Sequence, residues 1–237
     1  MELLYTDNRI VVCLKPAGVL STDEPGGMPE LLRRALGEDE TGCVRVVHRL
    51  DRPVGGVMVY ARSRMADSIL SRQVQAHTFE KDYLAVLEGI PDAPEGVLAD
   101  LLTRDAAKKQ TFVTHTPGPD ARPARLSYRV LGVKDGRALV RIRLETGRTH
   151  QIRVHLSHEG HPLVGDIKYG DRRVNGMAKN KLGITTQLLH AYQLKFSGLE
   201  ENFAYLNGKT VKAKLPEEFQ EALQKLGFTD KDLEAFA

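Results

Sequence analysis

The stretch Val47–Ala61 reads VHRLDRPVGGVMVYA and joins a charged loop to an apolar strand. Its first half places His48, Arg49 and Asp51 just before a turn that is rich in proline and glycine. Its second half, Val57–Ala61, is an apolar run typical of a buried strand. An aspartate in such a loop is often a turn former, because its side chain bonds the nearby backbone. The alternative is a carboxylate that a rigid strand holds open to a ligand.

The composition is that of an ordinary globular chain. Its 237 residues are 41% hydrophobic and 27% charged, and the net charge is +3. This length is enough for one large core or two small ones. The two cysteines, Cys13 and Cys43, form no CxxC pair and suit a reducing compartment. The first residues lack the pattern of a secretory signal, and no apolar run approaches membrane-spanning length. We therefore expect a cytoplasmic protein without membrane contact.

Strand patterns dominate the chain on both sides of this stretch. They occur at residues 10–14, 81–88, 97–102, 110–116, 126–134, 137–144 and 188–196. Short turns join several of them, and the Asp135-Gly136 pair is typical of a tight hairpin. Helical spacing occurs at residues 29–36, 65–77, 149–159, 216–226 and 230–236. The pattern predicts an α+β fold with a large mixed, mostly antiparallel β-sheet and flanking helices.

The domain organisation follows from the absence of any visible linker. We expect a single domain over residues 1–237, with an acidic helical extension at about 216–237. Residues 165–183 are rich in glycine and charge, and they predict a flexible loop on the substrate side.

Basic residues gather in the middle of the sequence. Between residues 122 and 153 there are nine Lys or Arg against two acids, whereas residues 216–237 hold six acids and two lysines. Period-two alternation places Arg141 and Arg143 on one strand face. The cluster is either a set of solvated strand faces or a phosphate-binding surface.

A second charged segment, Glu145–Gly170, reads ETGRTHQIRVHLSHEGHPLVGDIKYG. Gly147 ends a strand and Thr149 is placed to cap a helix, so Arg148 is displayed at their junction. Zinc ligation is one interpretation of the four histidines here, but the segment has no HExxH motif and no cysteine ligand. We therefore expect no metal site and interpret these residues as capping or hydrogen-bonding groups: His150, His155, His158 and His161.

Both segments together resemble the RluA-type family of pseudouridine synthases, which isomerise uridine in RNA. The resemblance covers about residues 4–199, with HRLD and GRTHQIRVH as its most specific pair. Its segments, in the expected order, are LKPAGVLS at Leu14–Ser21, HRLD at His48–Asp51, KDYLAVLEG at Lys81–Gly89, GRTHQIRVHL with HPLVGDIKYG inside Gly147–Gly170, and LHA at Leu189–Ala191.

Two departures from the family pattern are visible. The family often has Thr-Ser-Gly where this chain has Val54-Gly55-Gly56, a change that keeps the final glycine and bears on loop detail rather than activity. Many relatives carry a small N-terminal RNA-binding domain, for which there is no room before Tyr5. We therefore expect the catalytic domain alone.

The resemblance implies a pseudouridine synthase fold with a central RNA-binding cleft and an aspartate mechanism. Asp51 would be the reacting carboxylate, as a nucleophile or as a base on the sugar, and either role needs its ionised form. Arg148 would form its ion pair, because a nearby cation favours the charged carboxylate. Tyr83 would stack on the target base. The isomerisation conserves every atom of the uridine, so no cofactor is expected.

The remaining implied residues contact RNA or line the pocket. Arg49 would enter the RNA or contact its phosphates as the uridine flips out of its stack. Ile152 and Leu189 would form apolar pocket walls, and His48 would be structural. Relatives modify ribosomal or transfer RNA, so we expect such an RNA as the partner of a monomeric enzyme.

Three other functions compete with this interpretation. A hydrolytic glycosidase would usually need two carboxyl groups, with Asp166 or Glu145 as the possible partner of Asp51. A non-catalytic RNA-binding relative would be expected to lack Asp51, Tyr83 or Arg148, and all three are present. A zinc hydrolase would need a ligand set that the histidines do not clearly provide.

Overall fold

The structure is a computed structural model that describes residues 2–234. Its strands form an 11-stranded, mixed, mostly antiparallel sheet with flanking helices, which confirms the predicted α+β class. The chain divides into two compact units, Met1–Lys81 with His190–Lys214, and Asp82–Leu189 with Leu215–Ala237. The predicted single domain over residues 1–237 therefore stays a prediction.

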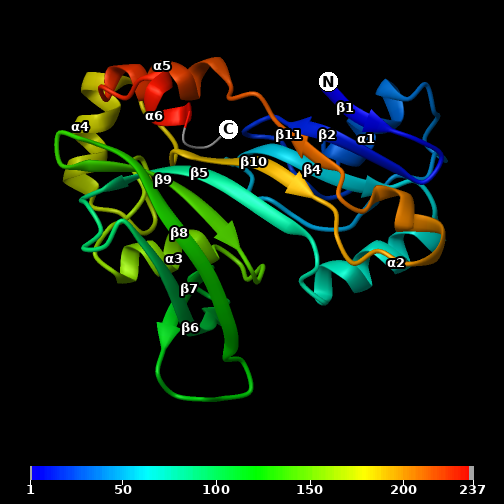
Figure 1. Ribbon diagram of the computed structural model, residues 1–237, viewed down its shortest axis with the longest axis horizontal. Coiled ribbons are helices and arrows are strands. Elements are labelled where there is room, and N and C mark those ends of the chain that lie inside the picture. Colours follow the sequence, from blue (N-terminus) through cyan, green and yellow to red (C-terminus); the bar gives the residue numbers. More distant parts are fainter. Residues whose placement is uncertain (1, 235–237) are drawn as a thin grey trace. The chain divides into compact units, whose positions relative to one another are not determined.

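The first unit is built around strand β4, whose seven residues are all buried. Its strands follow the order β1-β2-β4-β10 (Figure 1). In addition, β3 pairs with β4 and β11 pairs with β10. The β4–β10 pairing is parallel, whereas β1–β2, β2–β4, β3–β4 and β10–β11 are antiparallel. The elements are β1 (Glu2–Thr6), β2 (Ile10–Lys15), α1 (Met28–Ala35), β3 (Arg45–Val46), β4 (Gly55–Ala61), α2 (Arg64–Gln75), β10 (Leu189–Lys195), η1 (Glu201–Leu206) and β11 (Thr210–Lys212).

Apolar side chains of β2, β4, α2 and η1 make the core of this unit. Val59, Leu70 and Phe203 are fully buried members of one cluster. Helix α2 begins where Ser63 accepts a hydrogen bond from the N–H of Ala66, which satisfies one of the first helical donors. The apolar half of the opening stretch therefore forms a buried strand, as the sequence predicted.

The second unit has the strand order β5-β9-β8-β6-β7, and its β6–β7, β6–β8 and β8–β9 pairs are antiparallel. The predicted hairpin joins β8 and β9, since Asp135 and Gly136 both have positive φ, at 45° and 75°. The elements are β5 (Glu80–Glu88), β6 (Glu95–Asp105), β7 (Gln110–Thr114), β8 (Arg122–Lys134), β9 (Arg137–Leu144), α3 (Gln151–His158), α4 (Arg172–Leu182), α5 (Glu217–Lys225) and α6 (Asp230–Glu234).

Residues 165–183 were predicted to be a flexible loop, and this prediction is wrong. Most of them form helix α4, whose N-terminus is capped by the side chain of Asp171 and whose C-terminus ends at Gly183 in the left-handed conformation. Both signals are present in the sequence, but the helix carries few apolar residues and so lacks a strong periodic pattern. Residues 235 and 236 of the last predicted helix lie outside the described residues. Within residues 2–234, no helix is long and apolar enough to cross a membrane.

Candidate active site

The Asp51 loop links β3 to β4 in the first unit. Asp51 is half-buried, whereas Arg49 and Arg52 are exposed beside it. A turn closes the loop, because the N–H of Val54 donates to the carbonyl oxygen of Asp51 at 2.9 Å. The loop therefore presents one carboxylate and two guanidinium groups directly before the central strand.

His48 anchors the start of this loop. Its Nε2 accepts a hydrogen bond from the N–H of Val59 at 3.2 Å, which requires an unprotonated nitrogen. Burial lowers the pKa of His48 to about 3, and the charge of Lys81 contributes in the same direction. The imidazole is therefore neutral at neutral pH, which supports the structural role expected of it.

Lys15 is fully buried and contacts the Asp51 loop, although the sequence did not predict it as a site residue. Its Nζ donates to the carbonyl oxygens of Pro16, Arg52 and Val54, at 3.0, 3.1 and 2.7 Å. Burial lowers the pKa of this lysine to about 8, although the charge of Asp51 acts to raise it. One ammonium group thus ties the LKPAG segment to the Asp51 loop and places positive charge near the carboxylate. A lysine that ends an apolar strand was the available signal.

The glycines after the loop are explained by close backbone contacts. Gly56 has a φ of 135°, and a Cβ atom there would lie 2.2 Å from the carbonyl oxygen of Ala191 on β10. At Gly55 a Cβ atom would lie 3.2 Å from the carbonyl oxygen of Lys15, a tight contact. The final glycine of Val54-Gly55-Gly56, which the family pattern shares, is therefore required by the parallel β4–β10 pairing.

The other predicted site residues belong to the second unit. Tyr83 is buried on β5, Ile152 is buried on α3, and Leu189 is buried where β10 begins. Arg148 is half-buried in the loop between β9 and α3, where its Nε donates to the carbonyl oxygen of Pro123 at 3.0 Å. The proposed pair of Asp51 and Arg148 involves both units, and it stays a prediction.

Gln151 holds the Arg148 loop and was missed in the sequence. Its Oε1 accepts from the N–H of Arg148 at 3.0 Å and from the hydroxyl of Thr146 at 2.7 Å. Its Nε2 donates to the carbonyl oxygen of Arg125 at 3.0 Å. A buried amide inside GRTHQIR was the available signal, because buried polar groups need partners.

The predicted helix cap at Thr149 is wrong. The residue that precedes α3 is His150, in the left-handed conformation with a φ of 55°, and its side chain makes no capping bond. Its Nδ1 instead lies 2.7 Å from the hydroxyl oxygen of Tyr169. The loop therefore turns sharply into the helix, and long-range contacts rather than a local cap stabilise the turn.

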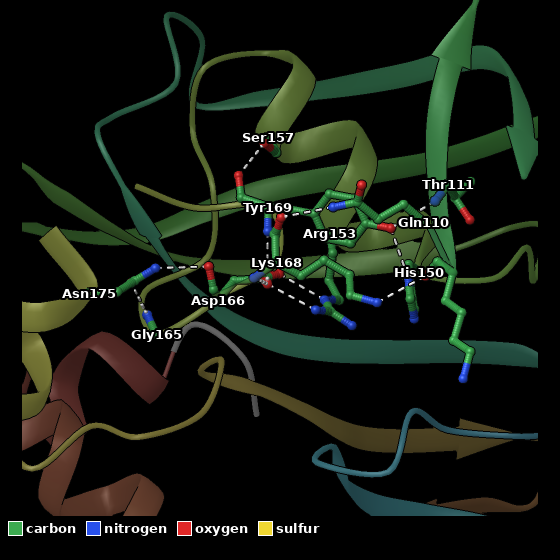
Figure 2. Close-up of polar contacts among 11 residues, drawn as sticks. Gln110, Thr111, His150, Arg153, Ser157, Gly165, Asp166, Lys168, Tyr169 and Asn175 are labelled. Carbon is green, nitrogen blue, oxygen red and sulfur yellow. Dashed lines mark hydrogen bonds and ion pairs between the residues drawn. The ribbon is translucent and has the colours of Figure 1, made fainter. Parts of the chain in front are cut away.

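A buried ion pair holds the segment after α3 (Figure 2). The guanidinium of Arg153 binds both carboxylate oxygens of Asp166, at 2.7 and 2.8 Å. Asp166 Oδ1 also accepts from the N–H groups of Lys168 and Tyr169. Burial acts to raise the pKa of Asp166, but the arginine and these N–H groups bring it below its ordinary value. Both oxygens are therefore engaged, which argues against Asp166 as the second carboxylate of a glycosidase.

Tyr169 extends this network toward β7 and α3 (Figure 2). Its hydroxyl accepts the N–H of Thr111 at 2.9 Å, and its ring lies 5.0 Å from the guanidinium carbon of Arg153. The side chain of Asn175 accepts from the N–H of Gly165 and donates to the carbonyl oxygen of Asp166, which attaches α4. The network therefore holds residues 165–175 in place, a segment for which the sequence predicted no contacts.

The histidines show no clustering that suggests a metal. Among residues 2–234, no group of three or more His, Cys, Asp or Glu is arranged to hold a metal ion. His155 is fully buried, 3.6 Å from Asp100, and burial lowers its pKa. Glu145, the other carboxylate considered for a glycosidase, forms an exposed ion pair with Arg125.

Comparison with known proteins places these features in one family. Residues 9–158 match the RNA pseudouridylate synthase family. An uncharacterized RNA pseudouridine synthase of Bacillus subtilis is 35% identical over 175 residues, which cover 72% of this chain and 58% of that protein. Ribosomal large subunit pseudouridine synthase C of Haemophilus influenzae is 32% identical over 231 residues, covering 95% of this chain and 68% of that protein.

A solved structure shows the same fold. Human RNA pseudouridylate synthase domain containing 4 is similar with a TM-score of 0.76 and 27% identity, and the match covers 95% of this chain and 93% of that one. The chain spans less than two thirds of the Bacillus relative's length.

Proposed function

Because the chain belongs to the RNA pseudouridylate synthase family, we propose that it isomerises specific uridines in ribosomal or transfer RNA to pseudouridine. The observation that carries the proposal is the Asp51 loop, in which a half-buried carboxylate precedes a fully buried strand and lies near the buried charge of Lys15. The match to the family over residues 9–158 includes this loop. The name of the Haemophilus relative supports ribosomal RNA as the substrate class.

The proposed reaction breaks the N1–C1′ bond of uridine and joins C1′ to C5 of the rotated uracil. Asp51 acts on the sugar or the base in its ionised form, and Arg148 holds and stabilises that carboxylate. Tyr83 stacks on the base. The hydrogen at C5 leaves as a proton, and N1 takes up a proton in place of its bond to C1′, so the reaction is redox-neutral and needs no cofactor.

The remaining residues act on the RNA. Arg49 is exposed next to Asp51 and contacts the RNA around the flipped nucleotide, whose extrusion costs a few kcal/mol. Ile152 and Leu189 provide apolar walls for the uracil. We propose residues 1–237 as one catalytic domain that acts as a monomer.

The test uses Asp51→Asn, which keeps the size of the side chain and removes its charge. Unmodified ribosomal and transfer RNA, labelled with tritium at uridine C5, release tritium when pseudouridine forms. We expect wild-type protein to release it and Asp51→Asn to release less than about one thousandth as much, as for loss of an essential reacting group. RNA affinity, measured by filter binding, should stay within about twofold, because phosphate contacts dominate it.

Asp39→Asn is the matched control, since Asp39 is an exposed aspartate in a loop of the same unit. It should release tritium at the wild-type rate. Substantial release by Asp51→Asn would disprove the assignment of Asp51. Free uracil in place of pseudouridine would identify a glycosidase instead.

A further inference from the structure

A pocket of about 480 Å³ opens on the sheet of the second unit, apart from the residues assigned to catalysis. We name it the three-strand pocket, because β6, β8 and β9 line it. Its lining residues are Glu95, Gly96, Val97, Ser127, Tyr128, Arg129, Arg141 and Arg143. Its volume lies within the range of small-ligand sites.

The strand register places the polar side chains of this pocket in two rows. Arg143 lies opposite Ser127, which lies opposite Val97. Residues two positions along each strand form the next row, where Arg129 lies between Arg141 on β9 and Glu95 on β6. Directly paired and alternate residues share one face of a sheet, so the two rows form a continuous floor.

The floor of the pocket is positively charged. Arg141 and Arg143 both bind Asp82, a carboxylate with no exposed surface, and a third of each arginine side chain stays exposed, at 32% and 33%. One carboxylate bound to two guanidinium groups leaves a net positive charge in a fixed geometry. The side chains of Arg129 and Glu95 form an ion pair and are each 64% exposed, so solvent screens their attraction. Arg129 can therefore readily bind another anion in place of Glu95.

The remaining lining suits a nucleoside. Val97 is 48% exposed and offers apolar surface for a sugar or a base, while Ser127 supplies a hydroxyl group. Arginine forks match the geometry of phosphate oxygens. The combination fits one nucleotide of an RNA strand, with its phosphodiester on the arginines.

The pocket is connected to the proposed catalytic residues through β5. Asp82, which fixes the two arginines, is the neighbour of Tyr83 on that strand, and adjacent strand residues point to opposite faces. The pocket and Tyr83 are therefore on opposite faces of the strand, so the pocket takes another nucleotide of the RNA than the target uridine. We infer that the three-strand pocket binds a nucleotide of the substrate RNA outside the catalytic pocket. This inference rests on the proposed function.

The test compares two valines of the same unit. Val97 lines the pocket, whereas Val133 on β8 is 44% exposed and does not. The probe is a fluorescein-labelled single-stranded RNA of about 12 nucleotides, a length typical of such sites. Fluorescence anisotropy should show that Val97→Glu weakens RNA binding by about tenfold or more, because a carboxylate in the pocket repels phosphate, whereas Val133→Glu stays within about twofold. Thermal unfolding verifies that both variants fold.

A second variant measures the phosphate contact itself. Arg129→Ala should lower the salt dependence of RNA binding, the slope of log K against log salt, by about one. Equal RNA affinities of Val97→Glu and Val133→Glu, with an unchanged slope for Arg129→Ala, would overturn the inference.

Two further results keep this test separate from that of the proposed function. If wild-type protein releases tritium while the Val97 variant binds RNA normally, the catalytic proposal stands and the pocket assignment fails. If wild-type protein forms no pseudouridine but Val97→Glu weakens binding, the pocket stands without that activity. If millimolar uridine monophosphate displaces the RNA from wild type but not from Val97→Glu, the ligand of the pocket is a free nucleotide and not an RNA strand.

Discussion

The Asp51 loop and the Asp166 segment each fix a carboxylate, but they do so in opposite ways. Asp166 has no exposed surface, both of its oxygens accept hydrogen bonds from Arg153, and Oδ1 also accepts from two backbone N–H groups. Asp51 is half-buried, and the buried Lys15 binds the carbonyl oxygens around it. The Asp166 carboxylate is fixed by direct hydrogen bonds to its oxygens, whereas the Asp51 loop is fixed through its main-chain carbonyl groups. Substitutions in the two regions should therefore have different consequences.

The largest loss of stability is expected from Asp166→Ala. The substitution leaves the buried guanidinium of Arg153 without its carboxylate, which typically costs about 3–5 kcal/mol of unfolding free energy. Urea unfolding of the variant measures this value. The exposed pair of Glu145 and Arg125 provides the control, because Glu145→Ala should cost less than about 1 kcal/mol.

A double variant measures how much of the lost stability comes from the unpaired charge of Arg153. Arg153→Met combined with Asp166→Ala removes both charges, so part of the lost stability should return. An Asp166→Ala variant as stable as the Glu145→Ala control would contradict the buried network, and the comparison with it.

Lys15→Met should reverse the pattern, with a smaller loss of stability and a larger loss of activity. Methionine fills similar space, but three carbonyl oxygens lose a charged donor, which is worth about 2 kcal/mol. The Asp51 loop then loses its support and its nearby positive charge, and we expect pseudouridine formation to fall by about tenfold or more.

The measurement combines urea unfolding with tritium release at saturating RNA. Asp166→Ala is the comparison variant, assayed well below its unfolding temperature, and it should keep a larger share of wild-type turnover than Lys15→Met. The opposite ranking would show that the Asp51 loop does not depend on the ammonium group of Lys15.

Local patterns in the sequence were sufficient for much of the fold. The period-two runs and the Asp135-Gly136 turn predicted the strands of the second unit, and the apolar run after Asp51 predicted the central strand. The HRLD and GRTHQIR segments pointed to the family. Helix α4 was missed because its few apolar residues gave no strong periodicity, although Asp171 marked its start.

Contacts that support the site were beyond reach because they are distant in sequence. Lys15 meets the carbonyl oxygens of Arg52 and Val54 across 37 and 39 positions, and only the β2–β4 pairing brings them together. The partners of Gln151 likewise depend on the pairing of the start of β8 with the end of β9. Composition shows that such residues are polar, but the fold decides that they are buried.

The smallest effect is expected from the titration of His48, which probes the Asp51 loop without removing a contact at neutral pH. Burial lowers the pKa of folded His48 to about 3, whereas an unfolded histidine titrates near 6.5. Between these values the unfolded chain binds more protons, so stability is fully present above about pH 6.5 and is lost as the pH falls toward 3. Between pH 7 and pH 5 we expect a loss of at most about 2 kcal/mol from this group.

The measurement is urea unfolding at both pH values for wild type and His48→Gln, whose amide oxygen can accept the Val59 N–H. The variant removes the titration of His48 and retains that of His190, whose pKa burial lowers to about 4. The stability difference between the two proteins should therefore shrink at pH 5, because only wild type loses the His48 contribution. If both proteins lose the same stability, His48 already carries a proton in the folded state at pH 5, and the Asp51 loop is held by Lys15 without the imidazole.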